Sequence, residues 1–578
     1  MFFAFITLNA WSQNPNFSNQ KIEQLLSDYY ELDRENIHLH LNKTVFLSNE
    51  TIWFKGYIIE KKESKLNFQT TNVFVRLLDN QNKEISNQLF YAANGIVEGK
   101  IKINESLPSG DYFLQTYTNY MNNFFENEAT IQKIKIINIQ DKSIINTNSN
   151  NQLSVNFSFE GGNLLYQTDN NIGVSIKNCF GKGQKISNIE VKNSKDVVVN
   201  SFSTNQEGYG KFELKNIENE TYRLVISNNG ETIIKELSKP VLEGINIQVN
   251  NYAIEGKAVI KIITNELTFN KNKNKNYTIL IQKNDYANYV DFVLDRPFKE
   301  LLIEKSSLFE GVNVIRLLDN ELNSISERVV YNVTENNTKL NITSTIKTKE
   351  SLNVKASIPN KIGNFSVSVL PKNTKSNYNY SNIQTNLAFK NYFESEDFDT
   401  SYYFSNFNKR KAFELDLMLL HVKESKYNWS RILNDAPKPT HSFDMGITVS
   451  GKINQNVPNK QNTKLRLFSI NGIEENTEIK DDNSFEFQNI MAVDSSTLYF
   501  SLIKKDDKLE SLGIYSKLEN TNRKFLKAFN YQKPLCEEIT FTKNLYDSNL
   551  EFPKLEGVYE LKDVDVIQAK KVKLERRG

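Results

Sequence analysis

Residues 51–59 read TIWFKGYII, and this stretch decides the fold class. Its apolar residues alternate with polar ones, so that Ile52, Phe54, Gly56 and Ile58 share one face. A repeat of two residues is that of a β-strand with one buried face. The stretch therefore predicts a half-buried strand of a β-sheet.

The same alternation continues on the C-terminal side of this strand. Residues 72–86, NVFVRLLDNQNKEIS, predict a strand, a turn at Asp79 and Asn80, and a second strand. Residues 107–118, LPSGDYFLQTYT, enter another strand through a turn that contains proline and glycine. Short strands with turn signals at regular intervals indicate a β-sandwich.

The pattern recurs block after block, which predicts a mainly β chain of tandem immunoglobulin-like sandwiches. The chain has 578 residues, and roughly 100–150 residues per domain gives about four to six domains. We expect sandwiches over 35–141, 150–241, 243–336 and 445–520, a strand region with a helical insert over 337–440, and a charged, mobile tail over 521–578.

Two segments have helical spacing instead. Residues 18–34 place apolar side chains three and four residues apart behind a Ser-Asn cap, which predicts an amphipathic helix packed on the first sandwich. In the insert, one helix face would carry Phe413, Leu417, Leu420 and Glu424, widened by Leu415, Met418, Leu419 and Val422. We expect this helix to be mostly buried, as a structural wedge between sandwiches.

The composition argues against some classes of protein. The 71 basic and 69 acidic residues nearly cancel and no basic stripe stands out, which argues against a nucleic-acid binder. The 37 Phe and 26 Tyr indicate a folded chain. With only Cys179 and Cys536, a disulfide framework is excluded; one bridge is arithmetically possible, but we expect two buried, unpaired thiols.

The first residues indicate export. Residues 1–13, MFFAFITLNAWSQ, form an apolar run that ends in small and polar residues, as in the remnant of a secretory signal peptide. A buried strand is the alternative. No cysteine follows for a lipid anchor, and no later run approaches the 18 apolar residues that would predict a transmembrane helix.

Residues 35–58, ENIHLHLNKTVFLSNETIWFKGYI, carry a longer motif. It is similar to E-K-V-Y-L-H-T-D-K-x-x-Y-x-x-G-E-x-I-W-F-K-A-Y, the opening motif of a family of multidomain envelope proteins from Bacteroidetes-type bacteria. The matching residues are Glu35, His40, Lys43, Glu50, Ile52, Trp53, Phe54, Lys55 and Tyr57. Asn42 replaces an Asp, and Asn49 replaces a Gly at a turn that needs a positive φ, which Asn tolerates best after Gly.

Further stretches resemble the same family in the same order. FSFEGGNLL, at 157–165, resembles F-x-P-E-G-G-x-L with Phe159 in place of Pro. The stretch 311–331 resembles a domain-closing motif through Gly311, Asn313, Leu317, Asp319, Glu327, Arg328 and Tyr331. The stretch 415–429 resembles a helical motif through Leu415, Asp416, Leu417, Leu419, Leu420, Tyr427 and Trp429. It lacks that motif's Gly-Trp, so we expect its helix end to pack differently.

The resemblance implies a domain order and a location. It implies macroglobulin-like sandwiches over the first three blocks and a non-catalytic, carboxypeptidase-regulatory-like sandwich over 445–520. YELKDVDVIQAKK, at 559–571, resembles the segment that leads into a TonB-dependent receptor plug, so the tail would end in a plug-like lead segment. The implied location is the outer membrane, on its periplasmic or its surface side. The implied partner is an outer-membrane transporter or another envelope protein.

The sequence offers weak candidates for metal binding. His38 and His40 lie two apart on a predicted strand, so both point to one face and could contact a metal together with Glu50. No cysteine or third histidine lies near them, and His421 and His441 are distant in sequence. We therefore interpret the pair as partly buried strand residues, and we expect no metal and no cofactor.

Signatures of catalysis are also missing. No G-x-S-x-G elbow, H-E-x-x-H pair or phosphate loop occurs, and neither cysteine lies in the Cys-x-Glu-Gln thioester needed for covalent protease trapping. We interpret the carboxylate pairs Glu394/Glu396 and Asp397/Asp399 as solvated surface. We interpret residues 319–321 and 481–483 as acidic turns rather than calcium loops.

The combined expectation is a protein with no catalytic residues, which acts as a binding or scaffold protein beside an outer-membrane transport system. One alternative is an enzyme that acts on envelope glycan or peptide, with a sugar cleft lined by Tyr392, Tyr402, Tyr403 and Trp429. These rings are more simply core residues. The other alternative is a passive spacer for surface display.

Overall fold

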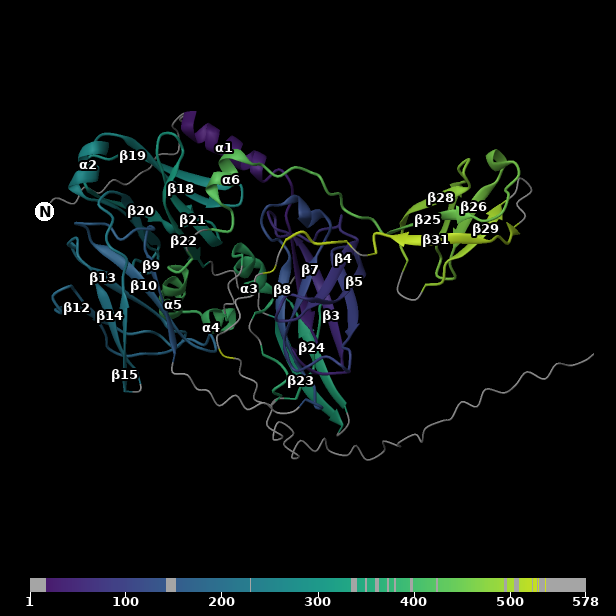
Figure 1. Cartoon of the computed structure of the whole chain (residues 1–578), viewed down its shortest axis with the longest axis horizontal. Helices are drawn as coiled ribbons and strands as arrows, with labels where there is room; N and C mark the ends of the chain where they lie inside the picture. Colours follow the sequence, from purple (N-terminus) through teal and green to yellow (C-terminus); the bar gives the residue numbers. More distant parts are fainter. Residues whose placement is uncertain are drawn as a thin grey trace, which may run out of the picture. The chain divides into compact units, whose positions relative to one another are not determined.

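The computed structural model describes residues 17–141, 152–228, 230–333, 340–348, 351–358, 363–371, 374–378, 381–394, 399–422, 425–492, 496–503, 509–521, 523–527, 529 and 536. The fold of these residues is mainly β, as the alternation predicted, with small sheets paired into sandwiches (Figure 1). No helix in the described ranges is long and apolar enough to cross a membrane. The expected signal-peptide remnant and the plug-like segment lie outside the described residues.

Sandwich 1 follows helix α1 (Phe17–Tyr29). Its strands are β1 (Glu35–Leu41), β2 (Val45–Leu47), β3 (Thr51–Glu60), β4 (Asn72–Leu78), β5 (Glu84–Ala93), β6 (Ile96–Lys102), β7 (Gly110–Tyr117) and β8 (Thr130–Ile137), in the order β1-β3-β6-β5-β4-β7-β8-β2. A short 3₁₀ helix, η1 (Tyr120–Asn123), follows β7. Strand β5 pairs with β4 over most of its length and with β6 at its end, so it connects the two layers.

Strand β3 confirms the predicted face, because Ile52, Phe54, Gly56 and Ile58 are all buried. Gly56 is needed there: a Cβ atom at this position would lie 2.5 Å from a methyl group of Val97. The turn before β3 also follows the prediction. Asn49 has a φ of 70°, the left-handed conformation that Asn adopts more easily than other residues with a side chain.

Sandwiches 2 and 3 each consist of a three-stranded and a four-stranded sheet. Sandwich 2 contains β9 (Leu153–Phe159), β10 (Asn170–Asn178), β11 (Ile189–Lys192), β12 (Val198–Phe202), β13 (Tyr209–Leu214), β14 (Arg223–Asn228) and β15 (Glu231–Glu236), in the orders β13-β10-β9 and β12-β11-β14-β15. Sandwich 3 contains β16 (Ile245–Asn250), β17 (Lys257–Thr264), α2 (Glu266–Asn272), β18 (Asn276–Lys283), β19 (Tyr286–Val293), β20 (Phe298–Glu304), η2 (Lys305–Ser307), β21 (Gly311–Leu318) and β22 (Ser324–Asn332). Its sheet orders are β16-β17-β20 and β19-β18-β21-β22, and each sandwich encloses its own apolar core.

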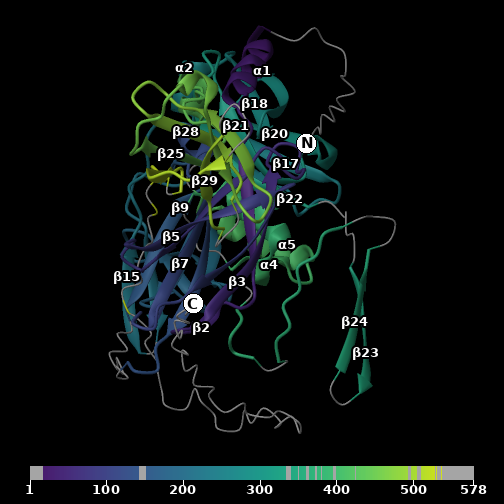
Figure 2. The same cartoon turned by 90° about the vertical axis from the view of Figure 1, so that its right-hand side faces the viewer.

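The next region contains a hairpin and short helices. The hairpin is β23 (Asn341–Thr348) with β24 (Ser351–Ser357), a sheet of two strands (Figure 2). The helices are α3 (Ile383–Ala388), η3 (Lys390–Tyr392), α4 (Thr400–Phe404), α5 (Lys409–Leu419) and α6 (Trp429–Asn434). We call residues 383–434 the helical insert.

Helix α5 is mostly buried, as predicted, although its apolar face differs in detail. Leu415, Leu417, Met418 and Leu419 are buried, whereas Phe413 is 38% exposed. Glu424, which was assigned to the same face, lies outside the described residues.

Contrary to the prediction, the first helix does not bury its apolar face on the first sandwich, although Tyr29 at its end contacts Glu126 there. Helix α1 contacts α6 and β19, and its buried Ile22 and Leu26 belong to the core cluster shared by the insert and sandwich 3. The sequence period predicts which face of the helix is apolar, but it carries no information about which apolar surface covers that face.

The terminal sandwich follows the insert. Its strands are β25 (Ile447–Ile453), β26 (Lys464–Phe468), β27 (Glu474–Glu478), β28 (Ser484–Ile490), β29 (Tyr499–Ile503), β30 (Leu509–Glu510) and β31 (Ile514–Glu519). A short 3₁₀ helix, η4 (Lys460–Asn462), lies between β25 and β26. The sheet orders are β28-β25-β31 and β27-β26-β29-β30, around an apolar core of their own.

The start of the expected mobile tail is instead anchored. Phe525 is buried in the core of sandwich 1, and the carbonyl of Arg523 accepts a hydrogen bond of 2.6 Å from Tyr117. The guanidinium of Arg523 also pairs with Asp444, with an Nε–Oδ2 distance of 2.9 Å. Composition suggested solvation for this segment, but one buried ring and one ion pair attach it to the sandwiches.

The expectation of unpaired cysteines is also wrong. Cys179, which follows β10 in sandwich 2, forms a disulfide with Cys536, and the backbone N–H of Cys536 donates to the carbonyl of Cys179 at 2.8 Å. The two residues are 357 positions apart, so no spacing rule could pair them. The bridge joins the segment after the terminal sandwich to sandwich 2.

Replacing Cys536 with Ser should lower the free energy of unfolding by about 2–5 kcal/mol, because the bridge closes a long loop of the unfolded chain. Urea unfolding measures the loss. The Cys179→Ser variant should lose the same amount, and the double variant should lose no more. Two free thiols in the denatured, unreduced wild-type chain would contradict the bridge.

Candidate functional site

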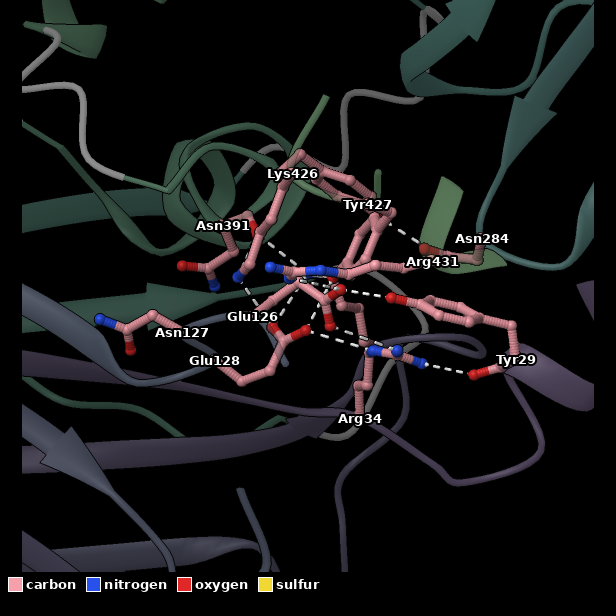
Figure 3. Close-up of polar contacts among 12 residues, drawn as sticks. Tyr29, Arg34, Glu126, Asn127, Glu128, Asn284, Asn391, Lys426, Tyr427 and Arg431 are labelled. Atoms are coloured by element: carbon pink, nitrogen blue, oxygen red, sulfur yellow. Dashed lines mark hydrogen bonds and ion pairs between the residues drawn. The ribbon is translucent and has the colours of Figure 1, made fainter. Parts of the chain in front are cut away.

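The chain buries an ionic cluster at the contact between sandwich 1 and the insert, with Glu128 at its centre (Figure 3). Glu128 lies between η1 and β8 and has no exposed side-chain area. One of its oxygens lies 2.9 Å from the ammonium of Lys426 and 3.4 Å from that of Lys61, and the other accepts from the hydroxyl of Tyr427 at 3.0 Å. Three elements from distant parts of the sequence therefore meet at one carboxylate.

Arg34, between α1 and β1, extends the cluster to a second carboxylate. Its Nε lies 3.2 Å from Glu128 and its Nη2 lies 3.5 Å from Glu126. Glu126 also accepts from the hydroxyl of Tyr29 on α1. The guanidinium carbon of Arg34 lies 4.6 Å from the ring centre of Phe124, so the cation also rests on an aromatic face.

The charges in this cluster are not balanced when every group is ionised. Arg34, Lys61 and Lys426 supply three buried cations, whereas Glu126 and Glu128 supply two carboxylates. Burial favours neutral Glu128, but the attraction of the three cations outweighs it and holds the pKa of Glu128 well below its usual range. Burial, together with repulsion from Lys426 and Arg34, lowers the pKa of Lys61 to about 7 despite Glu128. Loss of the Lys61 proton would reduce the excess of buried positive charge.

A second buried charge joins sandwich 3 to the insert. Arg316 on β21 has no exposed area, and its Nε lies 2.7 Å from a carboxylate oxygen of Glu327 on β22. Its Nη2 donates to the hydroxyl of Ser425 at 2.6 Å and to the carbonyl of Tyr427 at 3.0 Å. Trp429 covers the guanidinium and donates its indole N–H to the carbonyl of Leu322 at 2.7 Å.

A third junction joins sandwiches 2 and 3 to helix α5 through Arg328 on β22. Its guanidinium lies 3.0 Å from Glu160, which follows β9, and 2.6 Å from Asp416 on α5. Glu160 also accepts from the backbone N–H of Val249 at 3.0 Å. Burial outweighs the attraction of Arg328 and raises the pKa of Asp416.

These junctions give a structural role to several motif residues whose role the sequence did not reveal. Glu160, Glu327, Arg328 and Asp416, from three separate motifs, are the charged partners in the second and third junctions, and Tyr427 is shared by the first and second. The charged residues Arg34, Lys61, Glu126, Glu128, Arg316 and Lys426 were not singled out from the sequence. The sequence offered one indication of them: the charged motif residues lie next to apolar runs, where burial would require oppositely charged partners.

Residues of the opening motif, 35–58, stabilise the local structure of sandwich 1. Lys43 pairs with Glu50 at 2.6 Å, and Glu50 accepts from the backbone N–H of Leu47 at 2.7 Å, which closes the turn around Asn49. Burial raises the pKa of Glu35 to about 6, although hydrogen bonds from Thr118 and Thr70 oppose the shift.

An open cleft of about 1130 Å³ lies between sandwich 1 and the terminal sandwich. Strands β3, β5 and β6 line one side, the stretch 446–447 and Leu518 line another, and Val367 lies at a third. Trp53, at 55% exposed, is its largest exposed ring, and Lys100 lies over that ring at 5.6 Å. The cleft therefore presents aromatic and aliphatic surface with charged side chains at its edge.

The histidine pair behaves as the strand register predicted. His38 and His40 line the same cavity, and the Nδ1 of His40 lies 2.7 Å from the hydroxyl of Ser366. Glu50 does not line that cavity, because it is engaged with Lys43. Among the described residues, no group of three or more His, Cys, Asp or Glu side chains is placed to bind a metal ion.

The aromatic residues proposed for a sugar cleft do not form one. Tyr392, Tyr403 and Trp429 are buried, and only Tyr402 is partly exposed. The acidic turns also have local explanations: Asp319 accepts from two backbone N–H groups, and Asp482 accepts from Ser484. Asp399 caps helix α4, whereas Glu396 and Asp397 lie outside the described residues.

No model of a known protein family and no curated protein sequence matches this chain. Among solved structures, the chain is similar to Salmonella α-2-macroglobulin reacted with methylamine, with 9% identity, a TM-score of 0.16, and coverage of 56% of this chain and 25% of that one. It is similar to dimeric latent PorU from Porphyromonas gingivalis, with 10% identity, a TM-score of 0.22, and coverage of 57% and 34%.

A third similar structure is a tetra-tandem repeat from the extending region of a large adhesion protein, with 9% identity, a TM-score of 0.14, and coverage of 85% and 100%. The chain thus spans about a quarter of the macroglobulin and a third of PorU. Likeness of this size carries no argument about activity or partners.

Replacing Glu128 with Gln should destabilise the contact by about 3–5 kcal/mol, because it leaves buried cations without their shared carboxylate. Urea unfolding followed by tryptophan fluorescence, to which Trp429 beside the second junction contributes, measures the loss. The matched control is Glu98→Gln, which removes an exposed pair with Lys55 and should cost about 0–1 kcal/mol. Equal losses in the two variants would contradict the role given to Glu128.

The stability of the wild type should rise with pH above about 7 relative to Lys61→Met. Lys61 has a folded pKa of about 7 and an ordinary value of 10.5, so between these values the unfolded chain binds more protons. Below pH 7 both states are protonated and the full cost of the buried charge remains. From pH 7 to 9 the wild type should gain about 2 kcal/mol over the variant in urea unfolding. Parallel pH profiles would show that Lys61 stays charged.

Proposed function

We propose that this chain is a non-catalytic scaffold protein of the outer cell envelope, which binds a partner in a TonB-dependent receptor-type transport system. The observation that carries the proposal is that the buried charged side chains pair with one another where modules meet. Arg34, Lys61, Lys426, Arg316 and Arg328 are all buried, and all pair with carboxylates at contacts between modules. A charge enclosed in this way cannot reach a substrate, but it orients the modules that it joins.

The disulfide supports an exported location. Disulfides persist in oxidising compartments such as the bacterial periplasm and the cell surface, and they are rare in the cytosol. The Cys179–Cys536 bridge, together with the signal-like residues 1–13, therefore favours a protein that folds outside the cytoplasm. The motif at 35–58 and the plug-like stretch at 559–571 direct the proposal to the outer membrane and to TonB-dependent receptors.

The cleft beside Trp53 is the surface that we assign to the partner. Trp53, Tyr91, Val367 and Leu518 line it and each keeps more than a third of its surface exposed, whereas single exposed apolar residues are usually scattered. Exposed aromatic anchors with a charged rim are typical of protein–protein contacts. The proposal therefore predicts direct contact between this cleft and an envelope protein.

A photo-crosslinker in place of Trp53 tests this contact in intact cells of the source organism. The expected product joins the chain to an outer-membrane β-barrel receptor, identified by mass spectrometry. The matched control places the same crosslinker at Ile234, which is 56% exposed on β15 in sandwich 2 and does not line the cleft. This control should give no such product.

Two results would overturn the proposal. One is recovery of the Trp53 variant without any crosslinked membrane protein, in a folded chain with its disulfide intact. The other is the same receptor captured equally from Trp53 and Ile234, which would indicate random collision rather than a binding surface.

A further inference from the structure

Residues 363–371, GNFSVSVLP, lie between β24 and α3 and belong to none of the sheets of the described chain. Exposure alternates along them. Val367 and Val369 are 75% and 79% exposed. Ser366 and Ser368, beside them, are half-buried. Side chains that alternate with a period of two indicate an extended backbone, so this stretch resembles a strand that lacks a neighbour.

The serines attach the stretch to sandwich 1. The hydroxyl of Ser366 lies 2.7 Å from the Nδ1 of His40 and accepts from the hydroxyl of Tyr57 at 3.1 Å. Ser368 donates to the carbonyl of Asn42. The serines therefore face sandwich 1, and the two valines face away from it. This is the reverse of an ordinary half-buried strand, whose apolar side faces the core.

The backbone of the stretch is unpaired. Within the described part of the chain, no N–H or C=O group of residues 364–370 makes a hydrogen bond. Since buried backbone groups are almost always paired, these groups face solvent. The stretch is as long as an ordinary strand of roughly 5–6 residues. An exposed strand with free backbone groups is a template to which another strand can add.

The stretch also forms part of the wall of the cleft beside Trp53. Val367 lines that cleft together with Trp53, Tyr91 and Leu518. A strand that added to residues 364–370 would therefore meet the surface that we assign to the partner. A helix in the cleft would use its backbone groups within itself and would leave those of the stretch unpaired, so the backbone favours an extended occupant.

The charges of the cleft add a preference. Lys55 is paired with Glu98 at 2.6 Å, and both line the cleft. Lys100 lies over the ring of Trp53 and has no ion pair within the described residues. An acidic residue of the partner would supply the missing negative charge.

We propose that the partner enters the cleft as an extended segment that pairs, backbone to backbone, with residues 364–370. Apolar residues at every second position of this segment continue the exposed row of Phe365, Val367 and Val369, and an acidic residue pairs with Lys100. The inference rests on the proposed function, because it states how the partner of the same cleft is held.

Hydrogen exchange tests the free backbone first. In the purified chain, the amides of residues 364–370 should exchange at nearly the rate of an unfolded peptide, whereas those of β3 should be protected. In detergent-solubilised outer membranes that contain the partner, exchange should slow at least tenfold at alternate residues of 364–370. The pattern alternates because successive N–H groups of a strand point to opposite edges. Mass spectrometry of the chain measures both states, and strong protection in the purified chain would overturn the proposal.

Proline substitutions test the pairing directly. Val369→Pro and Leu370→Pro each remove one N–H group, from opposite edges, and proline is compatible with an extended edge strand. Each is combined with the photo-crosslinker at Trp53 and compared with alanine at the same position, which keeps the N–H. One of the two prolines should lower the yield of receptor product about fivefold relative to its alanine variant, as loss of one hydrogen bond does. The other proline should match its alanine variant.

The outcomes separate this proposal from the scaffold function. If Trp53 captures the receptor but neither proline lowers the yield, or both lower it equally, strand pairing is rejected and the scaffold function remains. If Trp53 captures no receptor in the parent chain, both are rejected. A product that joins two copies of this chain would assign the stretch to self-association and reject the proposal. An intact Cys179–Cys536 bridge and unchanged urea unfolding confirm that each variant is folded.

Discussion

The architecture depends on one buried carboxylate, that of Glu128. Sandwich 1 contributes it together with Lys61, and the insert contributes Lys426 and Tyr427. Arg34, which lies between α1 and β1, adds a third buried cation. Charges removed from water are stable only when oppositely charged or hydrogen-bonding groups surround them in a well-defined geometry. Apolar contacts between sandwiches impose no donor and acceptor geometry, whereas the ion pairs and hydrogen bonds of this cluster do.

In the other two junctions the central buried charge is an arginine, surrounded by carboxylates and hydrogen-bonding groups. Arg316 and Arg328 lie on neighbouring strands of sandwich 3, and both reach carboxylates and insert residues at once. Guanidinium groups suit this task because their planar array of donors can satisfy several acceptors together. Four charged motif residues, Glu160, Glu327, Arg328 and Asp416, take part. The stretches that contain these four residues therefore lie at the contacts between modules.

Hydrogen bonds attach residues 364–368 to sandwich 1. The hydroxyl of Ser366 binds both the Nδ1 of His40 and the hydroxyl of Tyr57, and Ser368 donates to the carbonyl of Asn42. These contacts place the segment beside β1, where Ser366 and Ser368 line both the cleft and a neighbouring cavity.

The sequence by itself determined the class of fold and much of the local structure. The face of β3 and the shared face of His38 and His40 follow from the two-residue period of a strand. The left-handed turn at Asn49 was predicted from the motif that the stretch resembles. Only the tertiary structure decided the surface that α1 covers, the partner of Cys179, the anchoring of Phe525 and the three ionic junctions. The reason is that strand alternation and turn chemistry are local, whereas each of these contacts joins residues tens to hundreds of positions apart. Such pairings depend on how the finished sandwiches pack together.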